Sequence, residues 1–242
     1  MELQSPFQRL QARLGDVIEK TPPGDRLLTE PALAKQLGVS RATLREAMRT
    51  FESQGVIRRR QGIGTFVVKR TKIIDSGLEV LQSIETMAKK IGLDVSMGAL
   101  QIDLFDSDGE YSEILGVKEG TSLVKVSRVI FVESRPVALL LDVLPENILT
   151  PADLETGFTG SVLDLLLRRG SPMLSRSLTN IQAEAASSDI ARAMQIQRGD
   201  VLLMFKARLY DTAENVVAFS TSYFLPGYFH FHIVRGVEGS VL

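Results

Sequence analysis

The segment Gly38–Val67, GVSRATLREAMRTFESQGVIRRRQGIGTFV, decides the fold of the first part of this chain. A Gly-Val-Ser turn opens it, and apolar residues then recur at helical spacing from about residue 41 to 54. Gly55 is suited to end that helix, because glycine readily adopts the left-handed conformation of a C-cap. Two strand candidates, 56–60 and 65–69, flank a QGIG hairpin tip. The residues expected to face inward from the helix are Leu44, Ala47, Met48 and Phe51.

The residues before this segment predict two further helices. Apolar positions in residues 6–20 follow helical spacing, and TPPGD (21–25) breaks that pattern. Thr29 is placed to cap a second helix that ends at Gly38, and Ser40 to cap the third. The resulting order of helix, helix, tight turn, helix and hairpin is that of a winged helix-turn-helix.

The charges divide unevenly along a chain of 242 residues whose formal net charge is only −1. Residues 1–70 contain 13 Lys and Arg against 7 Asp and Glu, a balance of +6, and residues 71–242 have a balance of −7. A basic segment joined to an acidic one indicates two domains with different partners. Because phosphate attraction dominates non-specific affinity for DNA, the basic segment is the candidate for binding double-stranded DNA.

The basic segment carries the candidate DNA contacts. A helix-turn-helix reads DNA with residues near the start of its second helix, and Arg41, Arg45 and Arg49 fall on the outer face of that helix. Each of them, taken singly, is more often a solvated surface residue, but the helix spacing, the charge switch and the glycine-rich wing point together to DNA. The contacts we expect are Thr29, Ser40, Arg41, Ala42, Thr43, Arg45, Arg49, Arg60, Gly62 and Gly64.

The composition excludes several classes of protein. The chain is 44% hydrophobic and 24% charged, as is typical of a globular protein with a real core. It has no cysteine, which excludes disulfides, thiolate zinc sites and cysteine nucleophiles. We see no signal-peptide pattern and no run approaching the roughly 18 apolar residues of a membrane span. We therefore expect a cytoplasmic protein with no membrane partner.

The remainder of the chain predicts an α+β fold with a mainly antiparallel sheet flanked by helices. Strands are expected at 96–105, 122–133, 135–145, 200–211, 215–225 and 228–235, with the ambiguous stretch 174–186 starting as a strand. Helices are expected at 108–117, 160–170 and 188–196, and at 77–91 as a connection. Neighbouring strands joined by short turns favour antiparallel pairing. This gives three parts: a winged helix-turn-helix at 1–70, a linker and connecting helix at 71–94, and a second domain at 95–242.

Residues 10–67 resemble the N-terminal domain of the GntR family of bacterial transcription regulators. The resemblance lies in PPGDRLLTEPALAKQLGVSRATLREAMRTFESQGVIRRRQGIGTFV. It implies that Arg41, Thr43 and Arg45 contact DNA and that Gly62 lies at the wing tip. Leu28-Thr29-Glu30 stands where Pro-Ser-Glu is usual, and Pro31 stands where some members carry a basic DNA contact.

Residues 95–235 resemble the ligand-sensing UTRA domain of the HutC branch of that family, which has a chorismate-lyase-like fold. Members that bind sugar phosphates often carry Arg-x-Arg where this chain has Arg128-Val129-Ile130, and acidic residues where it has Leu140 and Ala218. We therefore hypothesise an effector less polar than a sugar phosphate, with one acidic group held by Arg128. The candidate effector contacts are Ser83, Arg128, Ile130, Leu140, Arg208, Tyr210, Ala218, Ser220, Ser222 and Tyr223.

The sequence gives little support for a metal site. His230 and His232 alternate with phenylalanines on a strand, and a His-x-His pair can bind a metal ion, but no third ligand is apparent. We expect a solvent-facing stripe there, with no metal and no cofactor. The sequence predicts a homodimeric regulator, with repression favoured, on a palindromic operator. Two alternatives stay open: a dimeric DNA-binding protein that senses no effector, and a lyase-like enzyme.

Overall fold

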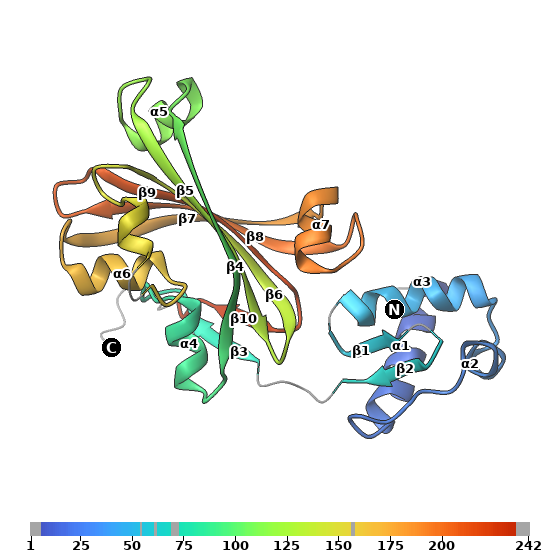
Figure 1. Ribbon diagram of the computed structural model, residues 1–242. Coiled ribbons are helices and arrows are strands. Elements are labelled where there is room, and N and C mark those ends of the chain that lie inside the picture. The colour runs from blue at the N-terminus through green and yellow to red at the C-terminus, as the bar shows by residue number, and fades with distance from the viewer. Residues whose placement is uncertain (1–5, 54, 61, 69–72, 156–157, 236–242) are drawn as a thin grey trace. The chain divides into compact units, whose positions relative to one another are not determined.

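The chain separates into two compact units in the computed structural model, which describes residues 6–53, 55–60, 62–68, 73–155 and 158–235 (Figure 1). The first unit is the chain up to Ile73 together with Pro226–Tyr228, and the second is Ile74–Leu225 with the chain from Phe229 onward. The domain boundary expected at residue 70 lies outside the described residues. Among the described residues, no helix is both long and apolar enough to cross a membrane.

The first unit contains three helices and a β-hairpin. The helices are α1 (Pro6–Lys20), α2 (Glu30–Leu37) and α3 (Arg41–Ser53), and the hairpin strands are β1 (Ile57–Arg60) and β2 (Gly64–Val67). The strands pair antiparallel, with Ile57 opposite Val67 and Arg60 opposite Gly64. This is the order expected from the sequence, so the winged helix-turn-helix is confirmed.

One apolar core holds the helices of this unit together. Burial of such side chains contributes about 25 cal/mol per Å² of apolar surface removed from water. Phe7, at the start of α1, stays 37% exposed and lies outside this core. The buried members are Leu10, Leu14, Ile18, Leu27, Leu33, Ala34, Leu37, Leu44, Ala47, Met48, Ile57 and Val67.

Helices α2 and α3 differ in how their N-termini are capped. Ser40 caps α3 as expected, because its Oγ accepts a hydrogen bond from the Thr43 backbone N–H at 3.1 Å. Thr29 occupies the N-cap position of α2, but its side chain makes no capping hydrogen bond. Thr29 therefore lies at the expected cap position but does not form the capping hydrogen bond. Gly38 ends α2 at φ 70°, a left-handed conformation that glycine adopts without a Cβ clash.

A six-stranded antiparallel sheet forms the centre of the second unit, in the order β4-β5-β6-β9-β8-β7. The ambiguous stretch is strand β7, and the α+β class is confirmed. The strands are β4 (Val95–Asp106), β5 (Ser122–Val132), β6 (Arg135–Pro145), β7 (Leu174–Ala185), β8 (Val201–Asp211) and β9 (Val216–Phe224).

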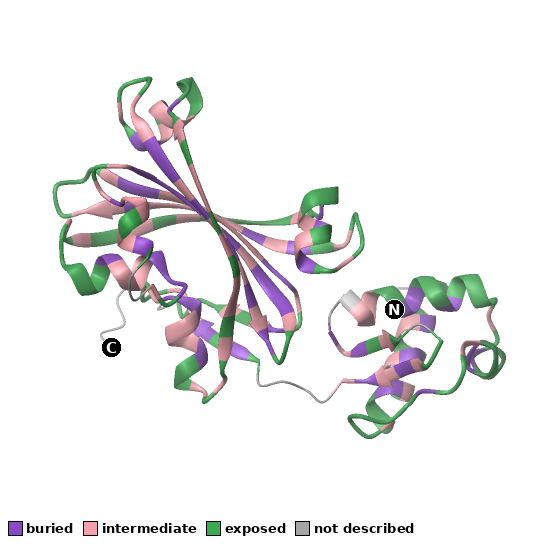
Figure 2. Cartoon of the chain, in the orientation of Figure 1, coloured by how far each residue is buried: buried purple, intermediate pink, exposed green. Residues whose placement is uncertain are grey.

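Helices cover both faces of this sheet (Figure 1). Helix α6 (Val162–Arg169), with the 3-10 helix η1 (Pro151–Leu154), packs its apolar side on one face, which we call face A. Helices α5 (Gly109–Leu115) and α7 (Ser188–Met194) lie against the opposite face B. Figure 2 shows buried residues concentrated along the central strands, as expected for a sheet covered on both sides.

The prediction of a helix at 77–91 is wrong for the first half of that range. The segment forms strand β3 (Ile74–Gly77), then an irregular stretch, and only then helix α4 (Ile84–Lys90). The helix starts late because Ser83 caps it, accepting a hydrogen bond from the Thr86 backbone N–H at 2.9 Å. Strand β3 pairs in parallel with β10 (Phe229–His232), about 155 residues away in sequence, a long-range contact that local periodicity does not encode.

Candidate functional sites

Helix α3 presents one charged face to solvent. Leu44, Ala47 and Met48 are buried in the core of the first unit, so helical spacing turns the remaining positions outward. The predicted contacts exposed on or beside this helix are Ser40, Arg41, Ala42, Thr43, Arg45 and Arg49. The structure therefore brings the expected helical contacts together on one surface.

Ion pairs hold part of this surface in place. Glu30, at the start of α2, lies 3.7 Å from Arg45 Nε and 3.1 Å from Arg59 Nη2. Arg49 pairs with Glu46 at 3.0 Å. Within the described part of the chain, Arg41 forms no ion pair. Sequence reasoning missed Glu30, because nothing in the local pattern shows that α2 and β1 meet there.

The hairpin carries further basic charge. Arg58 and Arg60 are exposed on β1, and the Arg60 guanidinium lies 5.4 Å from the centre of the Phe66 ring. Gly62 is exposed in the turn at φ 74°. Gly64 adopts φ 143°, and a Cβ there would lie 2.3 Å from Arg26 Nε. Glycine at position 64 is thus required by its backbone conformation and by the Arg26 side chain.

The effector candidates fall on two opposite faces of the sheet, because adjacent residues of a strand point in opposite directions. The strand register places one group on face A and leaves three candidates on face B. The candidates on face A are Arg128, Ile130, Leu140, Ala218, Ser220 and Ser222, and Ser83 belongs with them because it contacts α6. Those on face B are Arg208, Tyr210 and Tyr223.

Arg128 is the buried centre of the polar groups on face A. Its side chain is 5% exposed, and Nη1 donates to Asp142 Oδ2 at 2.5 Å. Nε donates to the carbonyl oxygen of Gly160, and Ser220 Oγ donates to the other oxygen of Asp142. An acidic partner for Arg128 therefore exists on β6, two residues beyond the apolar Leu140 on the same face. Sequence reasoning missed Asp142 because the strand register was not available.

A second set of polar groups faces Arg128 from helices α4 and α6. Ser83 Oγ donates to Asp164 Oδ2 at 2.6 Å, and Asp164 also lies in the first turn of α6. Burial raises the pKa of the Glu85 carboxyl, which the charge of Arg128 partly opposes. Glu85 Oε1 is buried without a hydrogen-bond partner among the described residues. We call Ser83, Glu85, Arg128, Asp142, Asp164 and Ser220 the Arg128 cluster.

The candidates on face B do not form a cluster of this kind. Tyr223 lines a pocket of about 380 Å³ under α7, together with Lys125, Asp189 and Phe219. Burial raises the pKa of its hydroxyl. Tyr210 lies under the guanidinium of Arg176, 4.0 Å from the ring centre, and Arg176 pairs with Glu214.

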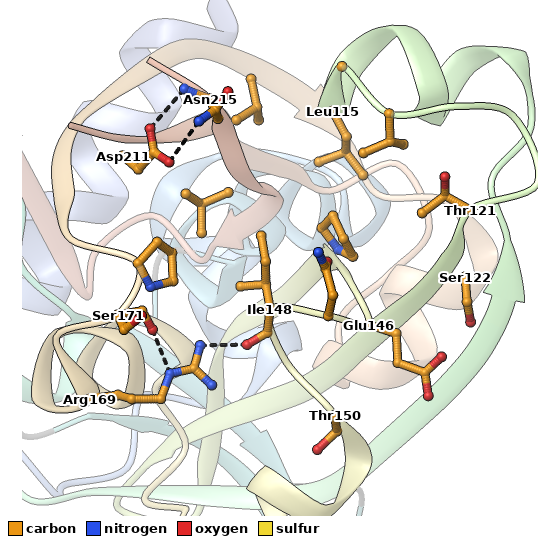
Figure 3. Close-up of a pocket in the computed structure, with 17 residues that line it drawn as sticks. Leu115, Thr121, Ser122, Glu146, Ile148, Thr150, Arg169, Ser171, Asp211 and Asn215 are labelled. Atoms are coloured by element: carbon orange, nitrogen blue, oxygen red, sulfur yellow. Dashed lines mark hydrogen bonds between the residues drawn. The ribbon is translucent and has the colours of Figure 1, made fainter. Parts of the chain in front are cut away.

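A wider groove of about 1100 Å³ lies where β6 ends and β9 begins (Figure 3). Its polar groups are largely bonded to one another. Arg169 donates to the carbonyl oxygens of Ile148 and Ser171 at 2.5 and 2.7 Å, and Asp211 accepts from Asn215 at 3.0 Å. None of the predicted effector residues lines this groove.

Both units match known protein families. Residues 7–67 match the model of the bacterial regulatory proteins of the gntR family, and residues 90–230 match the UTRA domain. The solved structure of PhnF from Mycobacterium smegmatis covers 95% of this chain and all of its own, with a TM-score of 0.64 and 21% identity. That similarity shows a shared fold.

Curated relatives with similar sequences carry regulatory names. The transcriptional repressor NagR of Bacillus subtilis is 29% identical over 184 residues, which cover 76% of this chain and 74% of NagR. The histidine utilization repressor of Pseudomonas putida is 26% identical over 200 residues, covering 81% and 78%. The exposed basic helix, the wing and these matches lead to one conclusion: the chain belongs to the GntR family of bacterial regulatory proteins and is a DNA-binding transcriptional regulator with a UTRA domain, not an enzyme.

Proposed function

We propose that this regulator is a repressor that places α3 in the major groove of its operator. The observation that carries the proposal is the continuous exposed face of α3, from Ser40 through Arg45 to Arg49, beside a basic wing. An arginine can bond the edge of guanine with two hydrogen bonds or hold a phosphate. Glu30 orients Arg45 while leaving its side chain 57% exposed, so the guanidinium stays available to DNA.

Replacing Arg45 tests this docking. We expect Arg45→Ala to weaken binding to the specific site by about 1–3 kcal/mol if the side chain reads a base. Fluorescence anisotropy with a duplex selected by the wild-type protein from a random library measures the change. Arg192→Ala is the matched control, because Arg192 is an exposed helical arginine of the second unit that also pairs with a nearby acid. Unchanged operator affinity in Arg45→Ala would contradict the docking proposal.

We propose further that a small-molecule effector binds at the Arg128 cluster on face A and alters operator affinity. Three carboxyl groups surround a single guanidinium there, and Arg128 is already paired with Asp142. A phosphate would have to displace that carboxylate, whereas a ligand that donates hydrogen bonds would find an unpartnered acceptor at Glu85. The effector is therefore less anionic than a sugar phosphate, and the expected acidic group on it is withdrawn, because Asp142 already pairs with Arg128.

A thermal-shift screen tests the effector proposal. Because a ligand selective for the folded state raises its stability, we expect uncharged or amine-bearing metabolites to raise the melting temperature. We expect Glu85→Gln to reduce the shift that such a ligand causes. Stabilisation by sugar phosphates alone would overturn the proposed effector class. A hit that leaves operator affinity unchanged would instead support a protein that binds DNA without regulation by that ligand.

The operator should be a palindrome bound by a homodimer. A helix-turn-helix of this kind reads one half-site with each copy, and half-sites then lie about 10 base pairs or a multiple apart. The acidic second unit is the candidate for dimerisation, because like-charged basic units on neighbouring half-sites repel one another.

A further inference from the structure

Two strands that are distant in sequence bring three potential metal ligands together. In the parallel pair of β3 and β10, His230 lies directly beside Asp75 and His232 lies beside Gly77. Nδ1 of each imidazole is 3.0 Å from Asp75 Oδ1. One ligand atom from each of the three residues falls within 4.8 Å of the others.

The surrounding residues hold this arrangement in place. Phe229 and Phe231 alternate with the histidines and pack against Phe224 of the central sheet, with ring centres 4.9 and 5.1 Å away. Both imidazoles therefore stay on the outer side of β10. A Cβ at Gly77 would collide with the Glu79 carboxylate and would lie 3.4 Å from His232 Nε2, an ordinary contact.

The spacing matches that of ligands around a transition metal. With bonds of about 2.0–2.1 Å, neighbouring ligand atoms of a tetrahedral zinc site are about 3.3 Å apart, close to the distances from each imidazole to Asp75. Two imidazoles and one carboxylate suit Zn²⁺, Co²⁺ or Ni²⁺, whereas Mg²⁺ and Ca²⁺ prefer oxygen ligands. The side chains are 43–67% exposed, so a metal ion and its remaining water ligands have access.

We propose that Asp75, His230 and His232 form a binding site for a divalent transition-metal ion of the zinc class. The bound ion bridges β3 and β10 and leaves at least one coordination position for water. Glu79 lies at the rim of the site and accepts a hydrogen bond from the Val234 backbone N–H. The sequence alone does not indicate this site, because the third ligand, Asp75, lies 155 residues from His230.

Titration of the full-length chain, purified without a histidine tag, tests the proposal. The chain has only two histidines and no cysteine, so imidazole ligation can come from this site alone. We expect one equivalent of Zn²⁺ or Co²⁺ per chain by isothermal titration calorimetry, with no competition from a tenfold excess of Mg²⁺.

Variants at exposed positions locate the site. We expect His232→Gln and Asp75→Asn each to weaken Zn²⁺ binding about tenfold or more, whereas Asp106→Asn, an exposed carboxylate on β4, leaves it unchanged. Circular dichroism checks that each variant is folded. The imidazole ¹⁵N spectrum of the wild-type chain gives a second readout that needs no variant, and both histidines should shift on adding Zn²⁺. No saturable binding up to 1 mM, or binding that survives loss of both histidines, would overturn the proposal.

Discussion

At the scale of single residues, the second unit depends on charged groups that are buried together. Arg128 has its opposite charge in Asp142, and removing one partner of such a buried pair commonly costs about 3–5 kcal/mol because it leaves the other uncompensated. Glu85 is different, because its carboxyl is buried with an oxygen that no described group bonds. It is therefore the member of the Arg128 cluster whose charge the fold disfavours.

Glu85 gives the stability of the protein a dependence on pH. A carboxyl whose pKa is raised in the folded state binds its proton more tightly there than in the unfolded chain. Its favourable contribution is present at pH values below the unfolded pKa and is lost as the pH rises through the higher folded value. We expect Glu85→Gln to raise the free energy of unfolding at pH 8 by about 1 kcal/mol and to change it little at pH 4.

Urea denaturation at both pH values measures this effect. Glu119→Gln is the matched control, because Glu119 is an exposed glutamate in the turn before β5. An equal gain from both substitutions at pH 8 would point to the overall acidity of the second unit rather than to the burial of Glu85.

At the scale of elements, the two helices beside the turn start in different ways. The Ser40 hydroxyl satisfies a backbone N–H at the start of α3, the end that carries the predicted base contacts. Thr29 holds the equivalent place in α2 without a side-chain bond, and Pro31 lies in the first turn, where its missing N–H costs little. The helix that is proposed to contact DNA is thus the one whose start is fixed by a side-chain cap.

Alanine substitutions at the two N-caps measure that difference. We expect Ser40→Ala to lower the free energy of unfolding of the first unit by about 1 kcal/mol, because a hydrogen bond to a helix N-terminus is lost. We expect Thr29→Ala to lower it by less than about 0.5 kcal/mol. Urea denaturation of the full chain, followed by amide exchange in α3, reports both. Equal losses would mean that Thr29 caps α2 in solution.

At the scale of the whole molecule, the near-zero net charge results from two opposed halves. The basic first 70 residues carry +6, and most of their exposed arginines lie on α3 and the wing. The remaining residues carry −7, which keeps the second unit from competing for phosphates. Salt-dependent DNA affinity should therefore arise from the first unit, while the proposed effector and metal sites lie in the second.

The sequence by itself determined the local elements and the family. Helical spacing, turn glycines and the basic stripe are short-range patterns, so α2, α3, the wing and five strands of the central sheet could be predicted, whereas the stretch of β7 was ambiguous. Leu44 and Arg45 illustrate this, since one position along a helix decides which is buried and which is exposed.

Only the tertiary structure decided which distant residues meet. The pairing of Arg128 with Asp142 follows from strand register, and the meeting of Asp75 with His230 and His232 follows from a parallel strand pair. The same strand pairing includes Gly77, the first residue of the expected 77–91 helix. Long-range pairing depends on burial and backbone hydrogen bonds summed over the whole unit, which no local pattern records.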